Sequence, residues 1–284
     1  METLLALSKT GRIKKIRPPE TVPAEGGISH DGSEVSETEY WKKYYHDPEF
    51  SYEWNNGYLE VKPVSDYSGF LMYWWFAEIL THFLNIRPIA RVIGLDIGFR
   101  LAFPGSTSIR KPDLAVILNA NSVIIRPGDF SYHGTYDLCI EFLSYSSPKE
   151  VRRDTVQKKR EYERAGVREY FILDPRGLET AFYRLSGKGK YGKIRPTADG
   201  VIQSRVLTGF QFRISDLYRQ PSLTELTEDE VYSSYVMTEY QAEKRRSEQS
   251  EKLLLMEKQR SEKLAEKLRD LGLSTEEIEK LCRE

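Results

Sequence analysis

The sequence predicts a mixed α/β (α+β) fold, with a mixed central sheet flanked by helices, followed by a long charged helix. Strand-like apolar runs at residues 136–143 and 169–173 flank a helical segment at 151–165. A strand, a helix and a second strand at this spacing are typical of a crossover that joins two strands of one sheet. From residue 238 to 269 the chain contains no Gly or Pro and consists mainly of Glu, Lys, Arg and Gln. This composition predicts the terminal helix.

Composition and charge exclude several classes of protein. The 284 residues include 42 Lys and Arg against 43 Asp and Glu, which argues against a tight, non-specific binder of nucleic acid. The most apolar window, 70–84, is too short to span a bilayer and contains Glu78 and His82, so we expect no membrane association. Cys139 and Cys282 match no metal or disulfide spacing, and we expect a reduced, cytoplasmic protein.

Changes in composition divide the chain into three parts. Residues 1–38 are rich in Gly, Ser and Glu and predict a mobile N-terminal tail. Residues 39–222 carry the strand and helix patterns of one domain, and residues 223–284 form a charged helical tail with a helix over 238–271. Leu264, Leu268 and Leu271 keep coiled-coil spacing, although the earlier positions of that repeat are largely polar. The helix is therefore a possible contact between copies of the chain in a homo-oligomer. Its repeat pattern alone does not predict a tight coiled coil.

Within the domain, local signals predict the elements in order. Asn56-Gly57 predicts a hairpin turn inside 52–61, and Gly166 predicts a left-handed cap at the end of the 151–165 helix. Residues 67–84 are apolar on every side, so we expect this helix in the core, with Trp74 packed there and not available to stack on a nucleobase. The expected strands lie at 91–102, 110–118, 136–143, 169–173 and 180–185.

Two carboxylates stand out among the predicted central strands. Asp113 begins the apolar run 113–118, and Glu141 lies in the middle of the apolar run 137–143. Strand alternation places Cys139, Glu141 and Leu143 on one face. A buried carboxylate is costly unless it meets a cation. Asp113 and Glu141 on neighbouring strands predict a paired-carboxylate site suited to Mg²⁺ or Mn²⁺, with the two carboxyl groups within roughly 4–6 Å.

A lysine on the following helix supplies the opposite charge. At 100° per residue, Lys158 falls on the inward-facing stripe of the 151–165 helix, near Thr155 and Tyr162. A lysine on a buried face needs an anionic partner, and the carboxylates of the preceding strands are the obvious ones. The pattern is equally compatible with a structural Lys158–Glu141 ion pair and with a lysine that acts on a phosphate or a water beside a metal.

An ordered set of short motifs runs through residues 112–175. The motifs are Pro112-Asp113, then Glu141-Phe142-Leu143-Ser144, then Arg153-Asp154 followed by Lys158 and Tyr162, and finally GVREYFILDP at 166–175. This set resembles the Uma2 family of candidate endonucleases, which belongs to the PD-(D/E)xK restriction-endonuclease-like superfamily. The likeness covers about residues 40–221.

The resemblance implies a restriction-endonuclease-like core and metal-dependent hydrolysis of DNA. It assigns Asp113 and Glu141 as metal ligands for Mg²⁺ or Mn²⁺. The lysine that the superfamily places two residues after the glutamate is Leu143 here, and Lys158 is positioned to replace it. Glu53 matches a glutamate that precedes a glycine in the family, which makes it a further catalytic candidate.

A second hypothesis belongs to a different class. The same core would be a scaffold without catalysis, and the 238–271 helix would bind DNA or a protein partner. Retention of Asp113, Glu141 and Lys158 favours the enzyme, whereas the near-neutral total charge favours the scaffold. A scaffold needs no divalent ion, so metal dependence separates the two.

Overall fold

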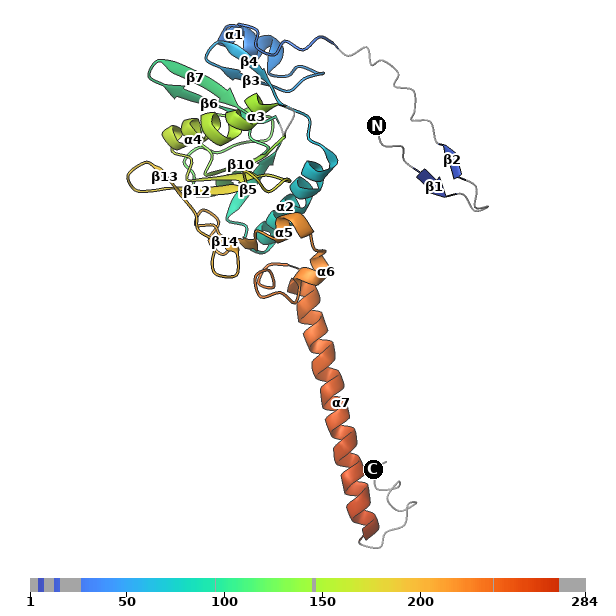
Figure 1. The fold of residues 1–284 in the computed structure, drawn as a ribbon. Helices are drawn as coiled ribbons and strands as arrows, with labels where there is room; N and C mark the ends of the chain where they lie inside the picture. Colours follow the sequence, from blue (N-terminus) through green and yellow to red (C-terminus); the bar gives the residue numbers. More distant parts are fainter. Residues whose placement is uncertain are drawn as a thin grey trace. The chain divides into compact units, whose positions relative to one another are not determined.

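The structure is a computed structural model that describes residues 5–7, 13–15, 27–94, 96–144, 147–236 and 238–270. In the last helix it describes the side chains of residues 246–264 and of Lys267. The sequence predicted one domain at 39–222. The chain divides into two compact units, and Figure 1 labels their helices and strands. The first comprises Met1–Lys62 and Phe103–Ile109, and the second comprises Pro63–Ala102 and Arg110–Glu284.

A hairpin and an aromatic core organise the first unit. Strands β3 (Tyr52–Asn55) and β4 (Tyr58–Val61) pair antiparallel, and β3 also pairs with β7 (Ser106–Arg110). Asn56 and Gly57 have φ angles of 49° and 100°, which confirms the predicted turn. The unit also contains β1 (Leu5–Leu7), β2 (Ile13–Lys15), α1 (Glu37–Glu39) and the π-helix η1 (Tyr40–Tyr44). Its buried side chains are Val35, Tyr40, Tyr45, Tyr52, Trp54, Leu59 and Ile109.

Part of the predicted N-terminal tail belongs to this first unit. Val35 is buried, and its carbonyl oxygen accepts a hydrogen bond of 2.9 Å from the Trp54 indole. Glu34 forms an isolated antiparallel bridge with Tyr58. Packed structure therefore begins before residue 39, because a single buried valine and backbone pairing hold a segment whose composition is otherwise polar.

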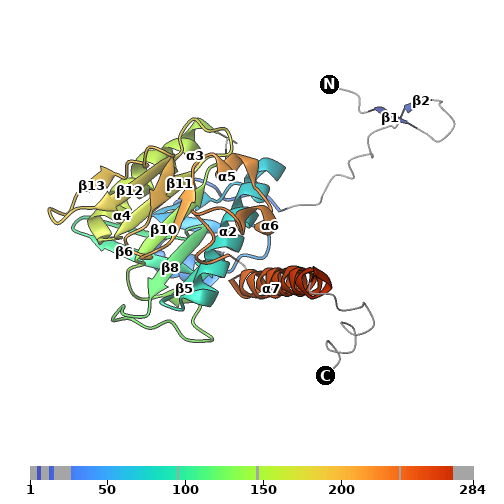
Figure 2. The ribbon, with the colours of Figure 1, turned by 90° about the horizontal axis from the view of Figure 1, so that it is seen from below.

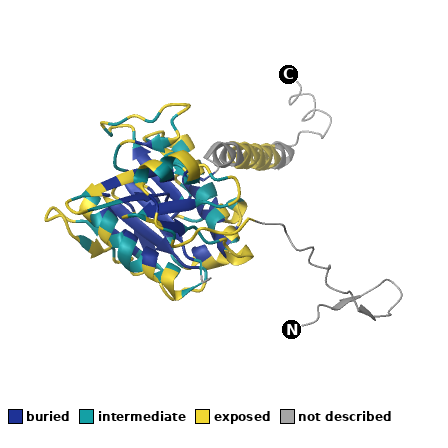
Figure 3. Cartoon of the chain, turned by 90° about the horizontal axis from the view of Figure 1, so that it is seen from above, coloured by how far each residue is buried: buried dark blue, intermediate teal, exposed yellow. Residues whose placement is uncertain are grey.

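A six-stranded mixed sheet organises the second unit, in the order β13-β12-β11-β10-β8-β5. Its strands are β5 (Ala90–Gly94), β8 (Leu114–Leu118), β10 (Leu138–Phe142), β11 (Glu169–Leu173), β12 (Ala181–Leu185) and β13 (Tyr191–Lys193). Strands β10 and β11 are parallel neighbours, as the strand–helix–strand spacing predicted, and the other pairs are antiparallel. Figure 3 shows that these strands form the buried centre of the unit.

Helices cover both faces of this sheet. Helix α2 (Tyr67–Ile86) packs its buried residues into one core cluster with Leu138, Ile140 and Phe142 of β10. The helical segment α3 (Pro148–Arg152), η2 (Arg153–Lys158) and α4 (Lys159–Ala165) contacts β10 through Glu141 on the opposite face (Figure 2). The predicted alternation along β10 is confirmed. The crossover helix therefore covers the face that carries Glu141.

Two long predicted strands are interrupted. The run 91–102 divides into β5 and β6 (Gly98–Phe103), and Asp96 between them has a left-handed φ of 63°. The run 110–118 divides into β7 and β8 around Lys111–Asp113. The sequence predicted each run as a single strand. A pattern of strand-forming residues does not show whether they form one strand or two successive strands in different sheets.

The remaining elements complete the second unit. They are β9 (Ser131–Tyr132), β14 (Val201–Gln203), β15 (Gln211–Arg213), α5 (Asp216–Arg219), α6 (Leu223–Leu226) and α7 (Thr238–Asp270). Tyr232 and Tyr235 are buried in its core, so the charged tail begins later than the predicted residue 223. No helix among the described residues is long and apolar enough to cross a membrane.

The predicted terminal helix is confirmed over its described extent. Helix α7 is continuous for 33 residues, and the side chains described over 246–264 are exposed. Leu264 is 56% exposed, as expected for a thin apolar stripe. The side chain of Leu268 and the whole of Leu271 lie outside the described residues.

The cap at Gly166 provides a first prediction. Gly166 ends α4 with a φ of 86°, as the sequence predicted. We expect Gly166→Ala to lower the free energy of unfolding by about 1–2 kcal/mol, because a side chain disfavours this left-handed backbone. Chemical denaturation measures the change. Gly187→Ala is the control, since Gly187 has no positive φ and a Cβ there meets no atom within 4 Å. Equal stability of the two variants would contradict the prediction.

Candidate active site

The two predicted carboxylates lie at the ends of neighbouring central strands. In the antiparallel β8–β10 pair, Leu114 is opposite Ile140. Extending this register by one residue places Asp113 opposite Glu141, and directly opposite residues of an antiparallel pair share a face. The Asp113 carboxylate accepts a hydrogen bond of 2.8 Å from the backbone N–H of Phe142, the residue after Glu141. This bond fixes Asp113 at the end of β10.

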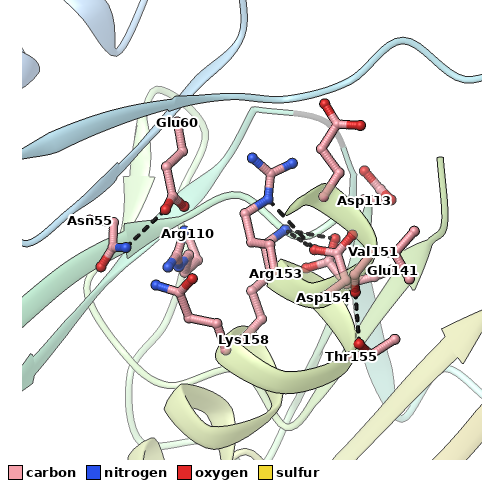
Figure 4. A network of polar contacts seen from close by, with 12 residues as sticks. Asn55, Glu60, Arg110, Asp113, Glu141, Val151, Arg153, Asp154, Thr155 and Lys158 are labelled. Atoms are coloured by element: carbon pink, nitrogen blue, oxygen red, sulfur yellow. Dashed lines mark hydrogen bonds and ion pairs between the residues drawn. The ribbon is translucent and has the colours of Figure 1, made fainter. Parts of the chain in front are cut away.

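Lys158 forms the centre of a buried charge network (Figure 4). Its ammonium group lies 3.0 Å from Glu141 Oε2 and 3.1 Å from Asp154 Oδ1. The side chains of Lys158, Glu141 and Asp154 are 1%, 2% and 7% exposed. The lysine is therefore on the inward face, as the helical stripe predicted. Two anions around one cation keep this buried site close to charge balance, which offsets part of the desolvation cost.

A π-helix places the members of this network. The sequence predicted one regular α-helix over 151–165, but residues Arg153–Lys158 form a π-helix between α3 and α4. Hydrogen bonds from i to i+5 bring Arg153 and Lys158 to the same side, and Arg153 is therefore buried although α-helical geometry would point it away. Arg153 Nε lies 3.9 Å from Asp154 Oδ1, which adds a second cation to the network.

Tyr162 fixes the other oxygen of Glu141. Its hydroxyl donates a hydrogen bond of 2.8 Å to Glu141 Oε1, one helical turn after Lys158. Tyr162 is fully buried and also packs against Phe99 and Tyr170. The Glu141 carboxylate is thus held from both sides by groups of a single crossover helix.

The neighbouring cysteine and tyrosine are protonated scaffold groups. Burial, together with the nearby Glu141 carboxylate, raises the pKa of the Cys139 thiol well above its ordinary value. Burial and the charges of Glu141 and Asp154 likewise raise the pKa of Tyr170, whose hydroxyl donates to the Asp154 carbonyl oxygen. Cys139 is therefore a small buried side chain and no nucleophile, as its strand position indicated.

Lys158 pairs with Glu141, and Asp113 is hydrogen-bonded to the residue after Glu141, while the predicted separation of 4–6 Å between the two carboxyl groups stays a prediction. Asp113, Glu141 and Lys158 lie in the second unit, whereas Glu53 is a buried residue of β3 in the first unit. Sequence reasoning gave no role to Asp154 or Tyr162, although both occur in the quoted motifs. The signal for Asp154 was its position four residues before Lys158, the spacing of a helical ion pair. Arg110, fully buried and paired with Glu161 on α4, gave no signal in the sequence.

The network provides a second prediction. We expect Tyr162→Phe to lower the free energy of unfolding by roughly 1.5–3 kcal/mol, the range for a hydrogen bond to a charged group. Thermal or chemical unfolding measures the loss. Tyr218→Phe is the matched control, because its hydroxyl contacts Thr180 in an exposed setting and Tyr218 is 40% exposed. A Tyr162→Phe variant as stable as the control would show that the bond to Glu141 contributes nothing.

The donor set fits a hard divalent cation. Mg²⁺ is commonly bound through one or two carboxylates and keeps several waters, and its carboxylate ligands often accept hydrogen bonds as well. Asp113 and Glu141 supply two carboxylates from adjacent strands, and the half-buried Asp113 is the more accessible. Within the described part of the chain, no group of three or more His, Cys, Asp or Glu residues is arranged to hold a metal.

Comparison with known proteins agrees with the fold and the motifs. The fold is that of a structurally characterised nuclease-like protein, titled "Crystal structure of a putative nuclease belonging to DUF820 from Anabaena variabilis ATCC 29413". The similarity has a TM-score of 0.51 at 17% sequence identity and covers 66% of this chain and 98% of that one, which shows the fold alone.

The family follows from the sequence model. The Uma2 model, described as "Putative restriction endonuclease", matches residues 38–215, and the chain belongs to this family. The resemblance seen in the motifs is thereby confirmed. No curated protein matched the chain.

Proposed function

We propose that this Uma2 protein is a metal-dependent nuclease that hydrolyses phosphodiester bonds of DNA in the cytoplasm. The observation that carries the proposal is the arrangement of Asp113 and Glu141 at the ends of β8 and β10, with Lys158 of the crossover helix 3.0 Å from Glu141. The family description, "Putative restriction endonuclease", supports a nucleic-acid substrate.

In this proposal the protein supplies position and charge. Asp113 and Glu141 would hold Mg²⁺ or Mn²⁺, which when bound polarises a phosphate and lowers the pKa of a water ligand. Lys158 orients Glu141, and its positive charge favours the additional negative charge of a phosphoryl transition state. Tyr162 and Asp154 restrain Glu141 and Lys158 in turn. Glu53 is retained as a further catalytic candidate because it matches the glutamate of the family motif.

A cleavage assay tests the function. Plasmid DNA and single-stranded DNA are incubated with the full chain in Mg²⁺, in Mn²⁺ and in EDTA. The proposal predicts cleavage in either metal and none in EDTA. Undiminished cleavage in EDTA would contradict metal dependence. An absence of cleavage in both metals would contradict the enzyme.

The second candidate is a non-catalytic scaffold that acts through α7. One observation favours it: both oxygens of Glu141 already contact protein groups, Lys158 and Tyr162. A structural ion pair needs no metal. This candidate would be supported if the chain cleaves no DNA but still binds it. Association with itself or with another protein through the exposed α7, again without cleavage, would also support it.

A further inference from the structure

Positive charge is concentrated between residues 147 and 195. This stretch contains 14 Lys and Arg against 7 Asp and Glu, whereas the whole chain contains 42 against 43. The excess is therefore local, and the rest of the chain carries the compensating negative charge. The stretch forms the crossover helix, strand β11 and the β12–β13 hairpin of the second unit.

The exposed charged side chains of α4 are all cations. Arg160 and Arg164 are exposed, one turn of the helix apart. The acids of the same helix are held by other groups of the protein. Glu161, 13% exposed, accepts hydrogen bonds of 2.6 and 2.9 Å from the guanidinium of the fully buried Arg110, and the side chain of Glu163 is 18% exposed. The outer surface of α4 is therefore positively charged.

The β12–β13 hairpin lies against this helix and adds further cations. Lys190 Nζ, on a side chain that is 76% exposed, lies 2.9 Å from Glu163 Oε1. Lys159 Nζ lies 4.1 Å from the centre of the Tyr183 ring on β12. Lys193 is directly opposite Tyr183 in the antiparallel pair, so it is on the same face of the hairpin. These contacts join the helix and the hairpin into one surface. We call this surface the basic face and define it as Lys159, Arg160, Arg164, Lys190 and Lys193.

The chemistry of the basic face fits a phosphodiester backbone. Guanidinium and ammonium groups both bind phosphate oxygens. Among the described residues 147–168 and 181–195, no large apolar side chain is exposed, although a surface that inserts into a lipid membrane carries such side chains beside its cations. On its inner side the same helix supplies Lys158 and Tyr162 to Glu141. The basic face is thus the outer side of the helix that holds a candidate catalytic carboxylate.

We propose that the basic face binds the phosphate backbone of DNA and is a docking surface outside the Asp113–Glu141 site. The inference rests on the proposed nuclease function, from which it takes the kind of partner, and it adds where that partner docks. Contacts between cationic side chains and phosphates supply affinity that does not depend on base sequence. A chain of near-neutral total charge can hold DNA in this way, because the cations are gathered on one surface.

The salt dependence of binding tests this inference without metal and without cleavage. The probe is a fluorescein-labelled duplex of about 20 base pairs and mixed sequence. Fluorescence anisotropy in EDTA gives its dissociation constant for the full chain between about 50 and 200 mM NaCl. With one phosphate contact for each of the five cations, the affinity of the wild type should fall about 500-fold over this range. Arg160→Gln/Arg164→Gln removes two contacts, so its affinity should be lower at about 50 mM NaCl and fall only about 40-fold.

The matched control removes two arginines from α7. Arg246 and Arg260 are exposed on a helix that contains 9 Lys and Arg against 8 Asp and Glu over 238–270. Arg246→Gln/Arg260→Gln changes the net charge by the same amount and should keep the affinity and the salt dependence of the wild type. Lys193→Gln is a second variant of the basic face, and its affinity should fall about 150-fold over the same range. Thermal unfolding establishes that each variant is folded.

The outcomes separate this inference from the proposed nuclease. Equal affinity and salt dependence of the wild type and Arg160→Gln/Arg164→Gln overturn the docking surface, even if the wild type cleaves DNA with Mg²⁺. A loss of binding only in Arg246→Gln/Arg260→Gln also overturns it and identifies α7 as the DNA contact. So does an unchanged affinity for the duplex when Arg160→Gln/Arg164→Gln no longer sediments with vesicles of equal parts phosphatidylcholine and phosphatidylserine, which identifies a membrane surface. Salt-dependent binding that requires the two arginines, in a chain that never cleaves, supports the docking surface and contradicts only the nuclease.

Discussion

Lys158→Met is expected to lower the free energy of unfolding by roughly 3–5 kcal/mol, the cost of breaking a buried ion pair by removing one partner. Without its ammonium group, Glu141 and Asp154 remain as buried carboxylates 2% and 7% exposed. The same change should abolish cleavage, because Glu141 loses the group that orients it. Denaturant unfolding gives the stability, and a plasmid assay gives the activity.

Lys188→Met is the control for this prediction. Lys188 is exposed in the turn between β12 and β13, so its replacement should change stability by less than about 0.5 kcal/mol. If Lys158→Met proves as stable as Lys188→Met, the buried network contributes nothing to the fold, and the account of the crossover helix is wrong.

Asp113→Asn is expected to abolish cleavage while stability stays equal or rises slightly. The asparagine oxygen can still accept the hydrogen bond from Phe142, and removal of a charge lessens repulsion with Glu141. Loss of a direct metal ligand should reduce activity by more than the roughly 10–100-fold that loss of an outer partner costs. The measurements are initial cleavage rates with Mg²⁺ and thermal unfolding of both proteins.

Added Mg²⁺ distinguishes a metal ligand from a structural acid. At 100 times its dissociation constant, an ion that binds only the folded state stabilises it by about 2.7 kcal/mol. Mg²⁺ should therefore raise the melting temperature of the wild type and of Asp199→Asn, an exposed control, but much less that of Asp113→Asn. Unfolding of Asp113→Asn, together with no effect of Mg²⁺ on the wild type, would favour the scaffold.

Most of the second unit could be predicted from local patterns. The parallel β10–β11 pair, the two faces of β10 and the inward position of Lys158 follow from periods of two and 3.6 residues. The division of 91–102 between two strands in different sheets could not be predicted from these periods, because distant parts of the chain determine which strands pair. The Asn56-Gly57 turn and the Gly166 cap were predictable because each requires a backbone that few residues adopt.

The errors at the candidate site and on α2 have physical causes. The sequence predicted a helix at 100° per residue over 151–165, whereas Arg153–Lys158 form a π-helix with Arg153 buried, and no propensity in the sequence marks that change. The sequence predicted Trp74 in the core, but Trp74 is 60% exposed, whereas Trp75 is buried against Pro221 and Tyr232. The two residues are chemically identical, so composition cannot tell which one the core covers. Asp154 was overlooked because a charged residue on a helix usually faces water, whereas here it shares Lys158 with Glu141.

Titration with Mn²⁺ tests most directly whether Asp113 and Glu141 hold a divalent cation. Electron paramagnetic resonance measures the Mn²⁺ that remains free in the presence of wild-type protein, Asp113→Asn or Asp199→Asn. We predict that the wild type and Asp199→Asn remove Mn²⁺ from solution equally, and that Asp113→Asn, folded under the same conditions, removes far less. Equal uptake by all three proteins, or none by the wild type, would contradict the proposed metal site.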